Sequence, residues 1–227
     1  MKKFFLMAAA ALLIGSTANA QDVFKQQGGE QNIEFLFAPL GGSPIGINGI
    51  KYRKFTSAST AIRATVFLGF NSEKDIMFGF ADGDQIELES VMSEFDISIA
   101  PGMEWHFAGT DKLSPYYGGE ALIAFSRTTD RTESQPGLEF GEEDVVEETT
   151  KDGSLTFGVN GFCGVDYYFA DNIYLGAELG FGLQFTTEFD TVQESDAEGA
   201  ETLETPNGNS FGIGPNVVGQ IRAGFLF

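Results

Sequence analysis

Residues 95–107 read FDISIAPGMEWHF and decide the fold class of this chain. Every odd-numbered residue in this stretch is apolar, and the even-numbered residues are polar or small. Strict alternation over this length is typical of a β-strand with two different faces, and it exceeds the usual length of strands in soluble proteins. Pro101 stands near the middle and has no N–H to donate to a neighbouring strand, so we expect a β-bulge there.

The same alternation recurs elsewhere in the chain. Residues 173–189 repeat it closely, and six further stretches follow it with more noise, at 32–40, 46–55, 60–70, 114–127, 155–169 and 211–227. Three connections are short (56–59, 108–113 and 170–172) and three are long (71–93, 128–154 and 190–210), while 41–45 breaks this rule by being short. Short and long connections alternate in outer-membrane barrels. We therefore predict an all-β fold, an eight-stranded antiparallel up-and-down transmembrane β-barrel with short periplasmic turns and long acidic extracellular loops.

Alternation alone does not say which face points outward. A soluble, lipocalin-like ligand-binding barrel also alternates, but its apolar face points inward. Here the apolar faces carry aromatic residues at both strand ends: Trp105, Phe107, Tyr117, Tyr167, Phe169, Phe225 and Phe227 toward the short turns, and Phe37, Phe70, Phe95, Phe125, Phe157, Phe185 and Phe211 toward the long connections. Two such girdles with aliphatic residues between them favour a lipid-facing band.

The opposite faces carry charges in the lower and middle parts of the strands. Because charged groups tolerate a protein interior only when they are paired, we predict a lumen salt-bridge network. Its members are Glu34, Lys51, Arg53, Arg63, Glu104, Glu120, Asp166, Glu178 and Arg222. The upper inward positions are small, namely Ala124, Gly158, Gly180, Gly182, Gly212 and Gly214, which fits either a shallow outward-facing cavity or a curved wall filled by Phe67 and Phe162. Eight strands leave no room for an open diffusion pore.

The N-terminus has the layout of a secretory signal peptide. Lys2 and Lys3 precede an apolar run at 4–14, and Ala18-Asn19-Ala20 supplies small residues for cleavage. We expect a signal peptide at 1–20, a short periplasmic segment at 21–31 and an outer-membrane barrel at 32–227.

Composition excludes several classes of function. The 227-residue chain has 33 acidic and 13 basic residues, a formal net charge of −20, which argues against nucleic acid as a partner. One cysteine and one histidine leave no internal disulfide and no zinc cluster. His106 falls at the periplasmic end of its strand, far from any outer rim, so we predict neither enzymatic activity nor a cofactor.

Most of the acid lies in the long connections. Residues 71–93 hold six Asp or Glu, 131–153 hold eight, and 190–209 hold six. This density indicates a hydrated surface, with divalent-cation binding as the sharper alternative. The weak metal candidates are Asp82, Asp84, Glu142, Glu143 and Asp144, without EF-hand spacing. Alternating Ile76 and Phe78 predict that 71–93 continues as a hairpin above the membrane, so surface recognition or adhesion through 71–93 and 131–153 is an alternative function.

Two segments resemble a known family. Residues 164–180, GVDYYFADNIYLGAELG, and 221–227, IRAGFLF, look like the late hairpin and terminal strand of OmpA/OmpX-like outer membrane β-barrel domains. The resemblance implies a monomer embedded in outer-membrane lipid. It also implies assembly by periplasmic chaperones and the barrel-assembly machinery, with Phe225 and Phe227 as the assembly signal. The resemblance names no extracellular ligand.

Overall fold

The computed structural model describes residues 25–37, 47–81, 84–134 and 145–227. The regular elements of these residues are all strands, and no helix among them is long and apolar enough to cross a membrane. The ten strands of this part of the chain are β1 (Gln31–Phe37), β2 (Ile47–Ser57), β3 (Thr60–Ala81), β4 (Asp84–His106), β5 (Leu113–Ser134), β6 (Val146–Ala170), β7 (Ile173–Glu188), β8 (Thr191–Ser195), β9 (Leu203–Thr205) and β10 (Asn209–Leu226).

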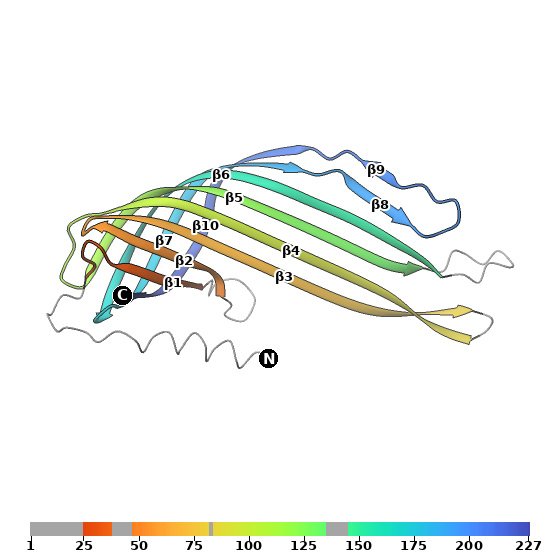
Figure 1. Ribbon diagram of the computed structural model, residues 1–227, viewed down its shortest axis with the longest axis horizontal. Coiled ribbons are helices and arrows are strands. Elements are labelled where there is room, and N and C mark those ends of the chain that lie inside the picture. The colour runs from red at the N-terminus through yellow and green to blue at the C-terminus, as the bar shows by residue number, and fades with distance from the viewer. Residues whose placement is uncertain (1–24, 38–46, 82–83, 135–144) are drawn as a thin grey trace.

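Eight of the strands close into an antiparallel ring (Figure 1). The sheet order runs β5-β4-β3-β2-β1-β10-β7-β6, and the pairing of β5 with β6 closes it. The two short strands β8 and β9 branch off β6 outside the ring. The predicted eight-stranded antiparallel barrel is therefore confirmed, with β8 and β9 as additions that the sequence did not indicate.

Four strands are much longer than the alternation predicted. β3 and β4 stay paired without a register shift from Thr60↔Trp105 to Ala81↔Asp84, which confirms the hairpin expected within 71–93. β5 and β6 likewise remain paired as far as Ser134↔Val146. Segments expected to be loops are thus largely sheet. The sequence pattern did not reveal this sheet because water contacts both of its faces, so the alternation of apolar residues disappears while the backbone pairing continues.

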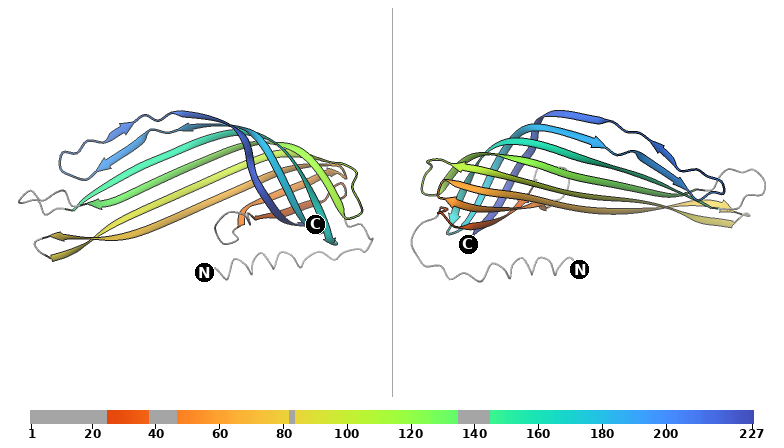
Figure 2. Two further views of the ribbon diagram at one scale, coloured as in Figure 1. Left: turned by 180° about the vertical axis from the view of Figure 1, so that it is seen from behind. Right: turned by 45° about the horizontal axis from the view of Figure 1, so that its top comes forward.

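Figures 1 and 2 show β3–β6 running well beyond the short strands β1 and β2 as a curved sheet. We call the closed ring, up to the level of Phe70 and Phe95, the lower barrel. The parts of β3–β6 beyond that level, together with β8 and β9, are called the upper extension; they comprise residues 71–81, 84–94, 126–134, 146–156, 191–195 and 203–205.

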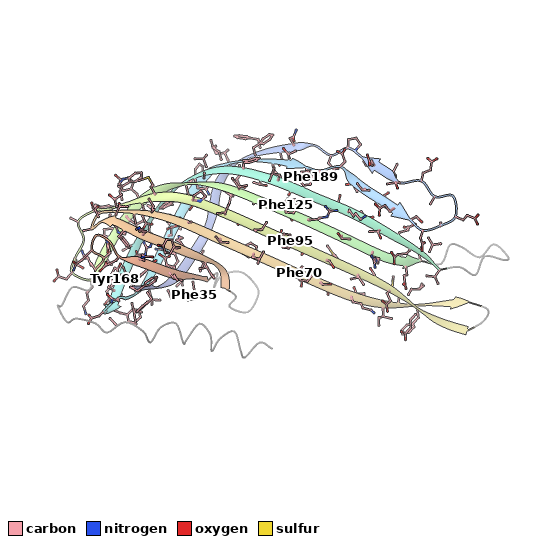
Figure 3. All side chains as sticks on the ribbon, viewed as in Figure 1. Phe35, Phe70, Phe95, Phe125, Tyr168 and Phe189 are labelled. Carbon is pink, nitrogen blue, oxygen red and sulfur yellow. The ribbon has the colours of Figure 1, made fainter. Side chains whose placement is uncertain are left out.

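The outward face of the lower barrel is an apolar band between two aromatic girdles. Phe70 pairs with Phe95, and Phe185 pairs with both Phe157 and Phe211, so the upper girdle is continuous across these strands. Figure 3 shows its members Phe70, Phe95 and Phe125 following one another across β3, β4 and β5. At the other end, the Trp105 and Tyr117 rings lie 5.7 Å apart.

The height of this band matches a bilayer. Trp105 and Phe95 lie about ten residues apart on β4, which at about 3.4 Å per residue and a tilt of about 40° gives a height of about 26 Å. Leu68 and Leu179 within the band are 67% and 66% exposed, whereas the charged face points into the ring. The apolar face therefore points outward, whereas a lipocalin-like ligand-binding barrel requires an apolar face that points inward.

The bulge expected at Pro101 is absent, so that prediction is wrong. Pro101 pairs with Ala64 of β3 in an unbroken register. On the other side, β4 pairs with β5 at Ile99↔Ile123 and again at Gly102↔Glu120, in the same register. The missing N–H is therefore accommodated by a short gap in the β4–β5 pairing, and no extra residue is inserted.

Candidate functional site

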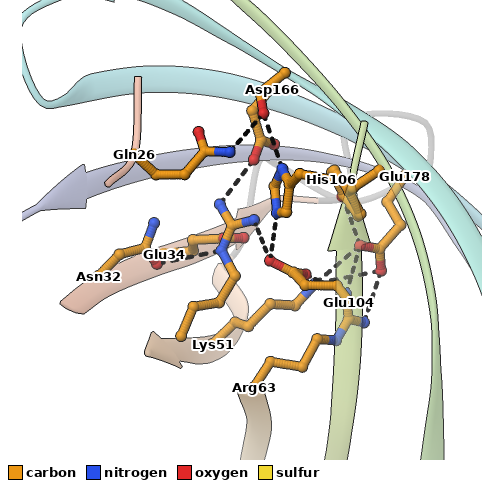
Figure 4. A network of polar contacts seen from close by, with 12 residues as sticks. Gln26, Asn32, Glu34, Lys51, Arg63, Glu104, His106, Asp166 and Glu178 are labelled. Carbon is orange, nitrogen blue, oxygen red and sulfur yellow. Dashed lines mark hydrogen bonds and ion pairs between the residues drawn. The ribbon is translucent and has the colours of Figure 1, made fainter. Parts of the chain in front are cut away.

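The inward face of the lower barrel holds the nine charged residues singled out from the sequence. The alternation of side chains places them all inside the ring, and each of the eight ring strands contributes at least one. The structure brings all nine into one connected set of ion pairs, which we call the lumen network. Figure 4 shows part of it from close by, with Glu34, Lys51, Arg63, Glu104, Asp166 and Glu178 labelled.

Arg53 on β2 lies at the centre of the lumen network and is fully buried. Its Nε atom is 2.5 Å from Glu34 Oε1, on the neighbouring strand β1. Its Nη1 atom is 2.7 Å from Glu104 Oε1, and its Nη2 atom is 2.8 Å from Asp166 Oδ2. One guanidinium therefore joins carboxylates from three strands, a geometry that its fixed fork of donors allows.

Arg222 on β10 completes a four-membered arrangement with Arg53. Its Nη1 atom is 2.9 Å from Glu34 Oε2, and its Nη2 atom is 2.6 Å from Asp166 Oδ1. Glu34 and Asp166 thus each bridge the two guanidinium groups. Arg222 Nη1 also lies 3.7 Å from Glu178 Oε2, which links this arrangement to the rest of the lumen network.

Glu178 on β7 is the second centre. Arg63 contacts both of its carboxylate oxygens, at 2.8 and 2.9 Å, in the bidentate geometry that gives strong charge-assisted bonds. Lys51 Nζ lies 3.2 Å from Glu178 Oε1. Arg63 also reaches Glu120 at 2.6 Å and Glu104 at 3.4 Å.

Neutral side chains complete the coordination of the acids. The Tyr116 hydroxyl donates to Glu178 at 2.7 Å, and the Tyr174 hydroxyl donates to Glu34 at 2.6 Å. The lumen network holds five carboxylates against four bases, so these neutral donors stabilise the excess negative charge. Among the described residues, only the Nε atoms of Arg63 and Arg222 are buried side-chain polar atoms without a hydrogen-bond partner.

The lumen network continues to the lower mouth of the barrel through His106. His106 Nε2 lies 3.1 Å from Glu104 Oε1, and Nδ1 lies 2.8 Å from Ser114 Oγ. Gln26 donates to the same Ser114 oxygen at 2.8 Å and is itself buried. His106 is therefore a hydrogen-bonding residue of the lumen.

Gln26 was missed by sequence reasoning. It precedes β1 in the segment assigned only as periplasmic, and the Tyr168 hydroxyl donates to its side-chain oxygen at 3.2 Å. Gln27, its exposed neighbour, has the same side chain, so no signal in the sequence separates the two. Their different environments arise from the docking of the segment against the barrel end.

Two glycines make room for the large side chains of the lumen. A Cβ atom added at Gly176 would lie 2.4 Å from Arg222 Nη2 and 2.5 Å from Asp166 Oδ1. A Cβ atom at Gly224 would lie 2.1 Å from the Tyr174 ring. The lower lumen is thus packed tightly enough that only glycine fits at these wall positions.

Above the lumen network, the lumen is hollow. A cavity of about 190 Å³ is lined by Phe67, Asp96, Ile97, Ser98, Ala124, Phe125, Ser126, Ser154 and Thr156. Of the small upper residues, Ala124 lines this cavity and Gly212 and Gly214 face open space. A Cβ atom added at Gly158 or Gly182 would lie 3.1 or 2.1 Å from its nearest neighbour, so the upper wall is partly open and partly filled. Phe162 packs on the Arg63 guanidinium, with 3.6 Å from Cζ to the ring centre.

The remaining candidates fall into two groups. The side chains of the metal candidates Asp82, Asp84, Glu142, Glu143 and Asp144 lie outside the described residues. Within the described ranges, no group of three or more His, Cys, Asp or Glu is arranged to hold a metal ion.

Phe225 and Phe227, which the family resemblance predicts to be the assembly signal, stack at the lower rim, with ring centres 6.4 Å apart.

Comparison with known proteins places this geometry in a family. The model of the "Putative OmpA-OmpF-like porin family" matches residues 87–213, more than half of the chain. Among solved structures, Ail, the attachment invasion locus protein of Yersinia pestis, is 14% identical, with a TM-score of 0.34 over 88% of this chain and 100% of that one. The N-terminal β-barrel domain of Pseudomonas aeruginosa OprF is 12% identical, with a TM-score of 0.29 over 89% and 100%. No curated protein matches the chain.

Proposed function

Because the chain belongs to the OmpA-OmpF-like porin family, we propose that it is an integral outer-membrane protein with a structural or surface-exposed role. Its lumen is closed by the lumen network, so it is not an open diffusion pore. The apolar band between the two girdles contacts lipid, the short turns face the periplasm, and the upper extension faces the exterior.

The observation that carries this proposal is the composition of the lower lumen. Large side chains from all eight ring strands meet there, and the guanidinium groups of Arg53 and Arg222 are completely inaccessible to solvent. A ring of eight strands is only wide enough for side chains to fill. The hollow upper lumen therefore ends on a packed floor and does not continue as a water-filled path.

Conductance across planar bilayers tests the closed lumen. We expect the refolded wild-type protein to give no stable large-channel steps, since ions have no continuous aqueous path. A known outer-membrane porin in the same bilayers serves as the positive control. Regular nanosiemens-scale openings from the monomer would overturn the closed lumen and make the upper cavity the vestibule of a channel.

Export and assembly form the second part of the proposal. Residues 1–20 direct export as a signal peptide, and Phe225 and Phe227 are read by the barrel-assembly machinery. Deleting Phe227 should lower the assembled fraction in outer membranes, measured by fractionation and heat-shifted gel mobility, while the exported amount stays constant. Normal assembly of the deletion variant would contradict the role of the terminal residue.

Surface recognition is a second candidate function, favoured by the size of the upper extension. β3 and β4 continue for about a dozen residues beyond the upper girdle as a paired hairpin, which offers an ordered surface to the exterior. Whole-cell adhesion assays that compare cells carrying the full chain with cells carrying a variant without residues 71–93 separate this function from a purely structural one. Equal binding by both cell types would exclude recognition through this hairpin.

A further inference from the structure

The upper part of β3 is an open sheet edge. β2 pairs with β3 only as far as Ile50↔Val66, and within the described ranges β3 pairs beyond that point with β4 alone. Among the described residues, no strand pairs with this side of residues 67–81, which border the curved sheet in Figure 1. An open edge presents backbone donors and acceptors that another extended chain can satisfy.

Charge is segregated between the two faces of the sheet beside this edge. The inner face, which continues the lumen face, carries Glu73, Asp75, Glu94, Asp96, Asp130, Glu148 and Asp152. The four bases of the upper extension, namely Lys74, Arg127, Arg131 and Lys151, all lie on the outer face. The inner face therefore has strong negative potential without internal compensation.

The ion pairs of the upper extension agree with this division. On the outer face, Lys74 pairs with Glu89 at 2.5 Å and Arg131 pairs with Glu147 at 3.2 Å. Lys151 pairs with Glu194 of β8 at 2.6 Å. Within the described part of the chain, no ion pair involves an acid of the inner face, so these carboxylates are available to an external cation.

The edge strand itself specifies the chemistry of a complementary partner. Glu73 and Asp75 lie on its inner face, while Ile76 and Phe78 lie on its outer face and are 50% and 60% exposed. Residues directly opposite each other in paired strands share a face, and opposite charges or apolar pairs there are stabilising. A strand that alternates basic and apolar residues therefore complements this edge.

A second copy of the same edge does not complement it. Two copies of this edge could pair antiparallel with their inner faces on the same side. In the three registers centred on this region, Glu73 then lies opposite Glu73, Glu73 lies opposite Asp75, or Asp75 lies opposite Asp75. The middle register also places Lys74 opposite itself. Like charges directly opposite each other destabilise a strand pair, so the edge disfavours self-association.

We propose that residues 67–81 of β3 bind, by strand addition, an extended segment of another protein that alternates basic and apolar residues. The partner strand hydrogen-bonds to the free edge, places its basic side chains near Glu73 and Asp75, and packs its apolar side chains on Ile76 and Phe78. This inference rests on the proposed function only in that the upper extension must face the exterior.

Fluorescence anisotropy tests the proposal with the full chain in detergent micelles. The probe is a capped, labelled eight-residue peptide of alternating lysine and valine, and its control has four lysines followed by four valines. We expect the alternating peptide to bind more tightly and to slow amide exchange in 67–81. Glu73→Lys/Asp75→Lys should weaken binding about tenfold.

A matched variant separates edge recognition from general attraction between opposite charges. Glu198→Lys/Glu201→Lys changes the net charge equally at two exposed acids between β8 and β9, away from the edge, and should leave the affinity within about twofold. The proposal would be overturned if the two peptides bound equally well, or if both double variants lost affinity equally. It would also be overturned if the folded, heat-modifiable barrel bound neither peptide. Dimerisation through 67–81 would overturn it in favour of self-association. Conductance is read independently, so an open lumen would contradict the proposed function without bearing on this edge.

Discussion

The lower barrel and the upper extension share strands β3–β6 but differ in how their inward faces are stabilised. In the lower barrel, the nine charges of the lumen network are ion-paired across the ring, as Arg63 is with Glu178, and all but Glu120 are buried. In the upper extension, the inward faces of the same strands carry acids such as Asp130 and Asp152 without basic partners. The backbone pairing is continuous through both regions, so closure of the ring, and not strand formation, determines where charges must be paired.

The largest effect should follow removal of one lumen guanidinium. Arg222→Ala leaves Glu34 and Asp166 each without one of their two arginine partners in a site closed to solvent. We expect a loss of about 3–5 kcal/mol in the free energy of unfolding, the usual cost of breaking a buried ion pair. Urea unfolding in lipid vesicles, followed by tryptophan fluorescence, measures it. A loss below about 1 kcal/mol would show that water reaches the lumen network.

A middle-sized effect should follow from overpacking the lumen wall. Gly176→Ala introduces a Cβ atom 2.4 Å from Arg222 Nη2 and should cost about 1–3 kcal/mol, since the neighbouring charges are held from several strands. Gly212→Ala is the matched control, because no atom lies within 4 Å of its added Cβ. Equal unfolding free energies for the two variants would mean that the lower lumen is as open as the upper one.

The smallest effect should follow from breaking an ion pair of the upper extension. Arg131 and Glu147 form an exposed pair at 3.2 Å, and such pairs contribute about 0–1 kcal/mol. Arg131→Ala should therefore unfold within about 1 kcal/mol of the wild type, and the difference should vanish in about 1 M salt. A loss as large as that of Arg222→Ala would erase the distinction between the two regions.

The sequence predicted the lower barrel well and the upper extension poorly, for one physical reason. Lipid on one side and a lumen on the other impose strict alternation, which revealed both the eight strands and the inward position of residues such as Arg53 and Asp166. Above Phe70, water contacts both faces and the alternation fades, so most of the sheet in 128–154 and the strands β8 and β9 were not expected.

Other details depended on long-range register, which no local pattern contains. The bridging of Arg53 and Arg222 by Glu34 requires β1 to lie between β2 and β10 at one register. The docking of Gln26 against Ser114 joins residues far apart in the chain. The straight course of β4 through Pro101 depends on a gap in the pairing with β5, where a local rule had predicted a bulge.

Residue-resolved amide hydrogen exchange of the protein in lipid bilayers tests most directly whether one set of strands forms both a sealed barrel and an open extension. The amides of 61–66 and 96–105 should be protected for hours, because they lie in the closed ring within the apolar band. Those of 71–81 and 84–93 should exchange far faster, with the free edge of β3 fastest. Equal protection along the whole length of β3 and β4 would contradict the division, as would rapid exchange within the lower barrel.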